Sequence, residues 1–473
     1  MEKTAVKTDH IHQMLHAPLL PLLLRMATPS AVAFFLQSFV SMAEIAFVSR
    51  LGTEPLAALA LIFPGLMLMQ MLSNGAIGGA VASSVARALG GGEQARADNL
   101  LWHALAIATL AGAGFFLAFT LLGEKLIVAT GVSATVAQAA TDYGSILFAG
   151  STIIWIMALL SAVYRGTGDI KTPSAVMAVG AIVQVPLSGA LILGWFKLPA
   201  MGLQGSVISL VIVSLLSSVF LLISLLRHHT LLRPRLATAR LQAYVFADIF
   251  KVGALASLSP ILTVAIVFFT NILVGRFGAS ALAGYGIVAR VEFLLIPLVF
   301  GIGAALPALV GVNMGAGQRR RAVRIAWLGG CVSAGLTGTV GLVFAVSPGL
   351  LLDWFTSDPV TWEAGRQYLV IVGPAFAFQG IGFALYFAAQ GGGNVVLPVT
   401  GTFLRFLIAT VAGYIGIHYL DFGLRYLFAC LSAAMVAYGL VTMSSLPFGW
   451  GRDVPNPNPT LPLPAKPLPR IPR

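Results

Sequence analysis

Charged residues are scarce in this chain. Of its 473 residues, 9% are Asp, Glu, Lys or Arg and 58% are hydrophobic, and the mean hydropathy is +0.92. Soluble domains carry about 25% charged residues, so this composition leaves no room for a large soluble domain. The sequence predicts instead an all-α integral membrane protein, in which long apolar helices cross the bilayer.

The residue patterns of reactive sites are also missing. Cys331 and Cys430 stand singly in apolar segments, which excludes a disulfide framework or a metal-binding spacing. The glycine-rich segments GGGEQARA and GAGQRRRA lack the Lys-Ser or Lys-Thr of a phosphate-binding loop. The seven histidines are scattered and form no motif with an acidic residue. We therefore expect no catalytic residues, no metal, no cofactor and no nucleotide.

Apolar stretches of about 20 residues predict about twelve transmembrane helices. We place the fourth at 142–164 and expect the first helix to bend at Pro29, because proline removes a backbone hydrogen bond. The predicted organisation is a cytoplasmic N-terminus at 1–17, a first lobe (TM1–TM6) at 18–226, a linker at 227–244, a second lobe (TM7–TM12) at 245–446 and a disordered proline-rich tail at 447–473.

The net charge of +12 does not indicate nucleic acid binding, because the basic residues lie mainly in short loops between the spans. About 20 Lys and Arg lie in the termini and after even-numbered spans, against about 6 after odd-numbered spans. Basic loops remain in the cytoplasm. We therefore expect a multi-pass protein of the bacterial inner membrane, with both termini cytoplasmic and a linker on the same side.

The two halves of the chain repeat each other at an offset of roughly 225 residues. An even number of spans in each half gives both halves the same topology and predicts a pseudo-twofold axis along the membrane normal. That arrangement is typical of transporters with a central site. The matching segments are FVSRLGTEPLAALAL (47–61) with LVGRFGASALAGYGI (273–287), GGGEQARA (90–97) with GAGQRRRA (315–322), and RGTGDIKTP (165–173) with QGGGNVVLP (390–398).

These segments resemble the signature blocks of the multidrug and toxic compound extrusion (MATE) family. The most specific are VSRLG, LAGYGIVARVE, VGVNMGAGQRRRA and RGTGDIKTP, and the resemblance covers roughly residues 18–447. It implies two six-helix lobes that form a V, and export of small organic cations against an inward flow of protons or sodium ions. We expect the protein to act as a monomer.

Glu44 and Glu292 are the acidic residues that we place deep in spans, one in each lobe. Helix geometry puts both about 10–15 Å below the outer surface. Burial removes solvation from the anion and so favours the protonated form, which would let each side chain take up a proton outside and release it inside. The alternative is that each carboxylate is held in a structural salt bridge or hydrogen-bond network.

Polar residues form stripes on several predicted spans. Because polar stripes must face protein or water, they can line an aqueous cleft, although packing between helices would also explain any single stripe. The predicted lining consists of Gln37, Ser41, Gln70, Asn74, Gln184, Ser188, Thr263, Thr270, Tyr285 and Gln379.

The resemblance also assigns individual positions. The first-helix aspartate of the family falls on Glu44, and a proline at which that helix bends in some members falls on Pro29. An Asn and Asp pair of proton-coupled members falls on Gln184 and Ser188. Two acidic residues of the sodium-coupled branch fall on Thr263 and Gln379, where no charge remains. This pattern favours protons over sodium as the coupling ion.

Arg290 and Arg405 are the basic residues placed inside spans. Arg290 lies two residues from Glu292, about 200° around the helix, so the two cannot face each other. We interpret Arg290 as a structural residue that snorkels toward a helix end or holds backbone carbonyls, and Arg405 as a candidate partner of Glu292.

Three functions were compared on these observations. A cation-coupled drug exporter is favoured. A flippase for a lipid-linked precursor would require a cleft richer in arginine and additional C-terminal spans, and an integral-membrane enzyme would require a catalytic cluster.

Overall fold

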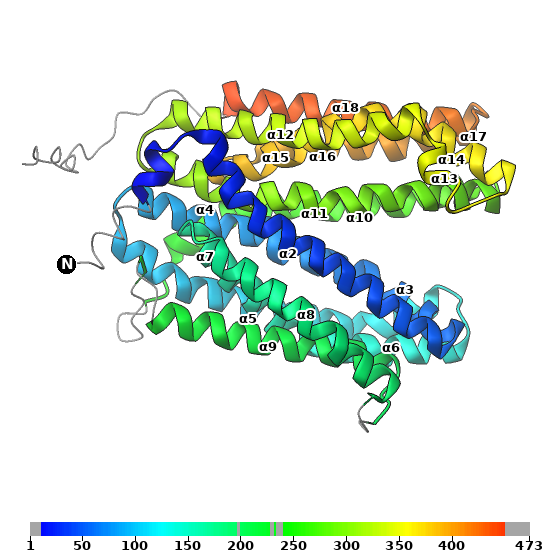
Figure 1. Ribbon diagram of the computed structural model, residues 1–473, viewed down its shortest axis with the longest axis horizontal. Helices are drawn as coiled ribbons and strands as arrows, with labels where there is room; N and C mark the ends of the chain where they lie inside the picture. Colours follow the sequence, from blue (N-terminus) through cyan, green and yellow to red (C-terminus); the bar gives the residue numbers. More distant parts are fainter. Residues whose placement is uncertain (1–10, 196–198, 228–230, 233–239, 450–473) are drawn as a thin grey trace, which may run out of the picture.

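The computed structural model describes residues 11–195, 199–227, 231–232 and 240–449, and within these ranges the regular elements are helices. The predicted cytoplasmic N-terminus and linker are only partly described, and the tail from 450 onward lies outside the described residues. Figure 1 shows a bundle in which the helices run along one long axis.

The described part of the first half of the chain contains ten elements. They are α2 (Leu19–Val48), η1 (Ser49–Leu51), α3 (Thr53–Gln70), η2 (Met71–Ala76), α4 (Ile77–Gly90), α5 (Gln94–Ala129), α6 (Ala134–Ala149), α7 (Ser151–Gly166), α8 (Lys171–Leu193) and α9 (Leu203–Arg227), of which α3, η2 and α4 form one continuous span. We call α2–α9 the first lobe.

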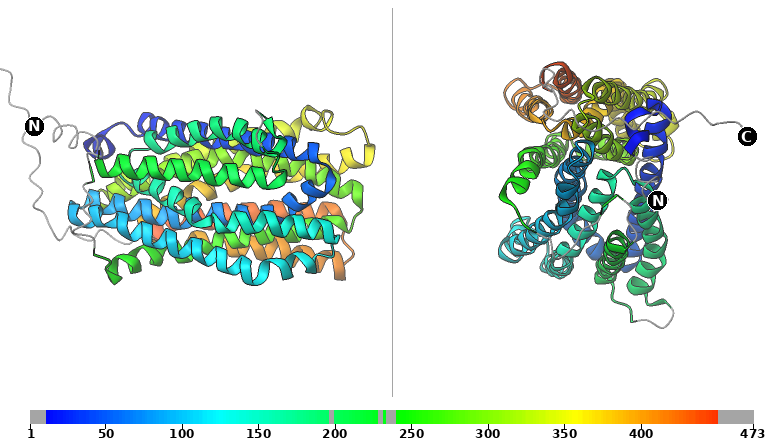
Figure 2. Two further views of the ribbon diagram at one scale, coloured as in Figure 1. Left: turned by 90° about the horizontal axis from the view of Figure 1, so that it is seen from below. Right: turned by 90° about the vertical axis from the view of Figure 1, so that its left-hand side faces the viewer.

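The second half contains α10 (Ala243–Gly275), α11 (Ala279–Gly315), α12 (Arg319–Val346), α13 (Gly349–Leu352), α14 (Pro359–Val372), η5 (Gly373–Ala375), α15 (Phe376–Gly392), α16 (Val396–Phe406), η6 (Leu407–Ala412), α17 (Gly413–Tyr419) and α18 (Leu424–Gly449). We call α10–α18 the second lobe. Seen along the long axis, the two lobes lie as two groups of helices (Figure 2).

Within the described residues, eleven helical segments are long and apolar enough to cross a membrane. The pair α6 and α7, which meet at a bend of 46°, gives a twelfth if it is counted as one broken span. The predicted fourth span at 142–164 is therefore wrong in its extent, because it starts in the middle of α6 and misses the break at Gly150. Helix α2 continues without interruption through Pro29, so a bend there stays a prediction.

Three pairs of turns confirm the internal repeat. Gly52 and Gly278 precede α3 and α11 with φ of 111° and 103°, and Gly92 and Gly317 precede α5 and α12 with φ of 75° and 74°. Gly168 and Gly393, with φ of 85° and 78°, do the same before α8 and α16. Such φ values favour glycine, since other residues place a Cβ too close to the backbone. The same sequence positions thus make the same turns in both lobes.

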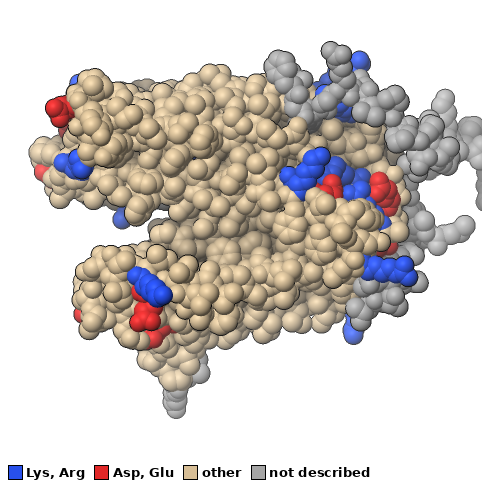
Figure 3. Space-filling view, turned by 180° about the vertical axis from the view of Figure 1, so that it is seen from behind, with Lys and Arg blue, Asp and Glu red and all other residues tan. Residues whose placement is uncertain are grey.

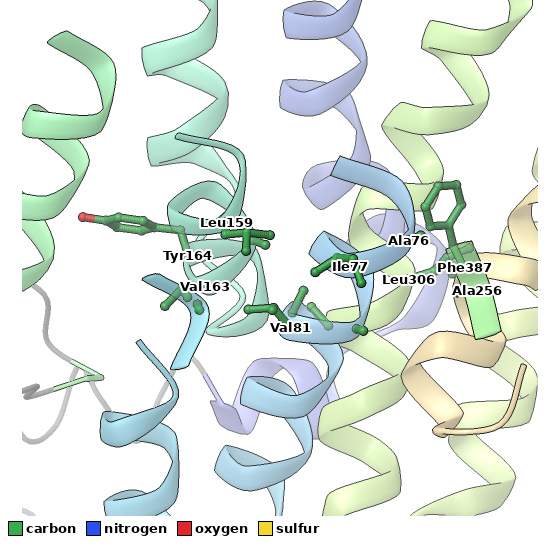
Figure 4. Close-up of a cluster of buried hydrophobic side chains, with 14 of the residues drawn as sticks. Ala76, Ile77, Val81, Leu159, Val163, Tyr164, Ala256, Leu306 and Phe387 are labelled. Atoms are coloured by element: carbon green, nitrogen blue, oxygen red, sulfur yellow. The ribbon is translucent and has the colours of Figure 1, made fainter. Parts of the chain in front are cut away.

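The two lobes meet mainly through α2 and α4. Helix α2 packs on α11, and α4 packs on α10, α11 and α15 of the second lobe. Figure 4 shows α4 side chains Ile77 and Val81 between α7 on one side and Leu306 and Phe387 of the second lobe on the other. The buried hydrophobic residues form two cores. The larger core includes these four side chains and continues across both lobes, whereas the smaller core lies within α10–α18 alone.

The lobes are in contact at one end of the bundle and apart at the other. We call the linker end the one at which α9 ends and α10 begins, and the far end the one that carries the turns at Gly52 and Gly278. The space-filling view shows a hollow between the lobes that opens at the far end, while charged side chains gather around the linker end (Figure 3).

An ionic network joins the lobes at the linker end. Asp248 of α10 accepts from Arg87 at 3.0 Å, from Arg96 at 2.8 Å and from Ser84 at 2.6 Å, and these three residues belong to the first lobe. Arg87 also donates to the carbonyl oxygen of Gln390, at 3.3 Å. Because hydrogen-bonded charges in a partly buried site are costly to separate, this network stabilises closure at the linker end.

Gly90 allows α4 to approach α11 closely, because it has no side chain. Its substitution therefore tests the closure of the two lobes at the linker end. A Cβ at Gly90 would overlap the backbone carbonyl oxygen of Val312 in α11, which cannot move aside as a side chain would. Such overpacking costs about 1–3 kcal/mol, so Gly90→Ala should shift the equilibrium toward linker-end opening by roughly 5- to 150-fold.

The measurement is the distance between two spin labels, determined by electron paramagnetic resonance. The labels are attached at Leu126 and Val346, which are exposed residues near the far ends of α5 and α12. Cys331 and Cys430 are first replaced by serine so that the labels are specific. Gly90→Ala should increase the population with a short far-end distance. Gly114→Ala, where a Cβ meets nothing within 4 Å, is the matched control, and identical distributions for both variants would contradict the prediction.

Candidate functional site

Glu44 lies half-buried in α2 and faces the interior of the first lobe. Its Oε1 accepts a hydrogen bond of 3.1 Å from Nε2 of Gln184 on α8. Ser188, one helical turn further along α8, is fully buried on the same face, and Tyr143 of α6 lies near the same carboxylate. The structure therefore brings together Glu44 and both α8 residues of the predicted site.

No described Lys, Arg or His lies within 4.0 Å of the Glu44 carboxylate. Its hydrogen-bond donor is a neutral amide, which can also accept a hydrogen bond if it rotates. Gln184 can thus serve as a partner to Glu44 in either protonation state. This geometry suits a carboxyl group that gains and loses a proton better than it suits a fixed ion pair.

Glu292 occupies the second lobe, in α11. The hydroxyl of Tyr368, from α14, donates a hydrogen bond to its Oε1. The ring of Tyr285, which lies two turns before Glu292 on the same face of α11, packs edge-on against Tyr368 at 5.5 Å between centroids. Arg405 lies within electrostatic range, yet no described basic group is within 4.0 Å of this carboxylate. The direct salt bridge between Glu292 and Arg405 that the sequence suggested is not formed.

The cavity beside Glu292 has an aromatic wall. One part of it is lined by Glu292, Gln379, Thr337 and Phe376, and a neighbouring part by Thr263, Tyr386, Arg405 and Tyr438. Phe300 and Phe383 line both parts, so the surroundings of Glu292 and of Arg405 share these two rings. Met71 and Gly75 of the first lobe close the neighbouring part, which places this cavity at the contact between the lobes.

The remaining predicted lining residues differ in their burial and in their hydrogen bonds. Gln37, Gln70 and Asn74 are half-buried, while Ser41 is exposed and donates to the carbonyl of Gln37 at 3.4 Å. Thr270 is buried with 2% of its surface exposed, and Thr263 donates to the carbonyl of Ser259 at 2.8 Å. Of the stripe on α10, only Thr263 lines the cavity. The lining role of the other residues stays a prediction.

Arg290 is exposed, whereas Arg405 is buried with 6% of its surface exposed. The exposed position suits the interpretation that Arg290, which lies inside α11, extends its long side chain toward the membrane surface. Arg405 lies beside the ring of Tyr438, with its guanidinium carbon 5.8 Å from the ring centroid.

Two π-helical segments flank the cavity, and the sequence pattern did not predict them. They are η2 (Met71–Ala76), which contributes Met71 and Gly75 to the cavity, and η6 (Leu407–Ala412), which begins two residues after Arg405. A π-helical turn widens the backbone and occurs frequently at functional sites. No signal of apolar periodicity distinguishes it from an ordinary α-helix.

Tyr143, Tyr368 and the network around Asp248 were also missed. A tyrosine in an apolar span does not reveal whether its hydroxyl meets a carboxylate, because the partner lies on a helix distant in sequence. Asp248 gave a usable signal, since it is an acidic residue near a span end and several arginines are predicted on the same side of the membrane. Among the described residues, no group of three or more His, Cys, Asp or Glu could hold a metal ion.

Two similar helical lobes around a polar and aromatic cavity define a membrane transporter by fold. The MatE family model matches residues 29–189 and 256–415, which together exceed half of the chain. The chain belongs to this family, the MATE multidrug efflux transporters, and the resemblance seen in the sequence is confirmed.

Relatives and solved structures agree with this assignment. A probable multidrug resistance protein NorM of Thermotoga maritima is 27% identical over 406 residues, covering 85% of this chain and 86% of the relative. An FAD transporter of Shewanella oneidensis is 27% identical over 375 residues, covering 78% and 82%.

Two solved structures share the fold at low identity. A transporter of the MOP superfamily from Pyrococcus furiosus aligns with a TM-score of 0.84 at 22% identity, covering 92% of this chain and 98% of that one. An outward-facing MATE family transporter aligns with a TM-score of 0.81 at 21% identity, covering 93% and 97%.

Proposed function

We propose that this multidrug efflux protein exports organic cations in exchange for protons, as a monomer in the bacterial inner membrane. The observation that carries the proposal is Glu44, a half-buried carboxylate whose hydrogen bond comes from a neutral amide and not from a basic group. A carboxylate with a basic partner would remain ionised, whereas one with an amide partner can exchange a proton.

The proposed cycle alternates between opening at the far end and opening at the linker end. The state shown in Figure 3 is hollow at the far end and closed at the linker end. Proton uptake by Glu44 and by Glu292 in this state removes a negative charge from each lobe and so lowers the affinity for a cation. A titrating carboxylate supplies the difference in affinity that such coupling requires.

Proton coupling predicts the outcome of transport in proteoliposomes. Efflux of a fluorescent cation should follow an imposed pH gradient and should need no sodium, because Thr263 and Gln379 offer no charge for a sodium site. Glu44→Gln should lower the gradient-driven rate by roughly tenfold or more, the effect of about 1.4 kcal/mol of lost coupling. Glu44→Asp should keep part of the activity, because it retains a titrating group.

Glu54→Gln is the matched control, since Glu54 is an exposed carboxylate near the far-end turn. It should transport at the normal rate. Strict dependence on a sodium gradient would contradict the proton coupling, and normal pumping by Glu44→Gln would contradict the role of Glu44.

If Glu292 binds cations, its substitution should impair the export of cations selectively. Glu292→Gln should impair export of cations much more than export of neutral substrates, because only cations gain from the charge. Tyr368→Phe removes the hydrogen bond but keeps the charge, so it should preserve the preference for cations. Export rates of a cationic and a neutral dye from the same vesicles measure both effects. An equal loss for both dyes in Glu292→Gln would assign the residue a structural role instead.

The linker end is proposed to face the cytoplasm, which also places both termini there. Arg320 is exposed at this end, and Trp354, with 86% of its surface exposed, lies at the far end. In a background without native cysteines, Arg320→Cys should react with an impermeant maleimide only after the cells are permeabilised. Trp354→Cys should react in intact spheroplasts, and the reverse pattern would invert the orientation.

A further inference from the structure

Among the described residues, Arg405 is a buried basic residue that no acid contacts directly. It has 6% of its surface exposed and lines the cavity between the lobes. Among the described residues, no carboxylate oxygen lies within 4.0 Å of its guanidinium group. A buried charge without a partner is strongly unfavourable. The ring of Tyr438 at 5.8 Å offsets this only in part, since a cation–π contact is worth about 0.5–2 kcal/mol.

Glu292 attracts Arg405 through space but does not contact it. Its carboxylate accepts from Tyr368 and lines the other part of the cavity, and the rings of Phe300 and Phe383 lie on the boundary of both parts. The guanidinium group therefore borders a space that is also lined by five aromatic residues and by Met71, Gly75, Ser259, Pro260, Thr263 and Thr402. The π-helical segment η2 contributes Met71 and Gly75 to this space, and η6 begins two residues after Arg405.

We propose that Arg405 is a substrate-binding residue that takes the anionic group of an aromatic acid. A carboxylate, sulfonate or phosphate can accept two parallel hydrogen bonds from a guanidinium group. The aromatic body of the same molecule would lie against Phe300 and Phe383. The cavity thus binds cations on the side of Glu292 and aromatic anions on the side of Arg405.

This inference rests on the proposed export function, because it names a substrate class for the same cavity. An aromatic acid is favoured over the head group of an anionic lipid because the walls near Arg405 are mainly rings. Rings stack on a flat molecule, whereas a lipid tail gains nothing specific from them. The two sources share the anionic group, so the experiment must distinguish them.

The test compares flavin mononucleotide with riboflavin, which have the same ring system and differ by a phosphate. Binding to the purified full-length protein in a neutral detergent is measured by fluorescence polarisation at neutral pH. Flavin mononucleotide should bind about tenfold more tightly than riboflavin, the effect of about 1.4 kcal/mol. Equal affinities in the unmodified protein would overturn the proposal.

Variants then assign the preference to Arg405. Arg405→Gln should weaken binding of flavin mononucleotide to the riboflavin level and leave riboflavin binding unchanged, which also shows that the variant is folded. Arg405→Lys should restore part of the preference, because lysine supplies the charge but not the planar pair of donors. Arg290→Gln is the matched control, since Arg290 is an exposed arginine in a span. A similar loss in this control would overturn the role of Arg405.

An anionic lipid is tested in the same assay. Micelles containing phosphatidylglycerol should not displace flavin mononucleotide more than micelles containing a zwitterionic lipid. Displacement by phosphatidylglycerol that is lost in Arg405→Gln would instead identify a lipid head-group site. Binding is measured without an ion gradient, so its outcome does not depend on whether transport follows protons or sodium. Failure of this inference and failure of proton coupling are therefore separate results.

Discussion

The close approach of α4 to the second lobe is the contact on which the rest of the architecture depends. It is made through Gly90, whose hydrogen faces a backbone carbonyl of α11, and through Arg87, which donates to Asp248 and to the end of α15. Because this contact joins the lobes at the linker end, the same rigid helices must separate at the far end. The hollow seen in Figure 3 is thus the geometric consequence of closure at the opposite end.

The bilayer adds a second constraint, which is the cost of each charge placed inside it. The structure meets this cost in three different ways. Glu44 has an amide partner, Glu292 has a tyrosine hydroxyl, and Arg405 has an aromatic ring. None of these partners carries the opposite charge. Each buried group therefore remains available to an ion or a substrate, which fixed ion pairs such as that of Arg87 with Asp248 are not.

The sequence predicted the features that repeat or that depend on one helix. The paired turns at Gly52 and Gly278 follow from a repeated glycine, and the shared face of Gln184 and Ser188 follows from helix periodicity. It could not predict contacts between distant segments, such as Tyr368 with Glu292, because nothing local marks the partner. The break between α6 and α7 was missed for a related reason: a glycine at the break is common in continuous spans as well.

The cavity and the linker-end contact are mechanically joined in both lobes. In the first lobe, η2 places Met71 and Gly75 on the cavity wall, and α4 continues directly from it to Arg87 and Gly90. In the second lobe, α15 carries Phe383 and Phe387 on the cavity wall and Gln390 at the contact, about one helical turn further along.

A ligand that shifts either wall therefore shifts the contact, because helices transmit displacement along their axes. The π-helical turn of η2 is the weaker link in this connection, since its widened hydrogen-bond pattern is less stable than that of an α-helix. Under the proposed cycle, substrate binding in this cavity and closure at the linker end would compete through these two helices, without a separate relay between the cavity and the gate.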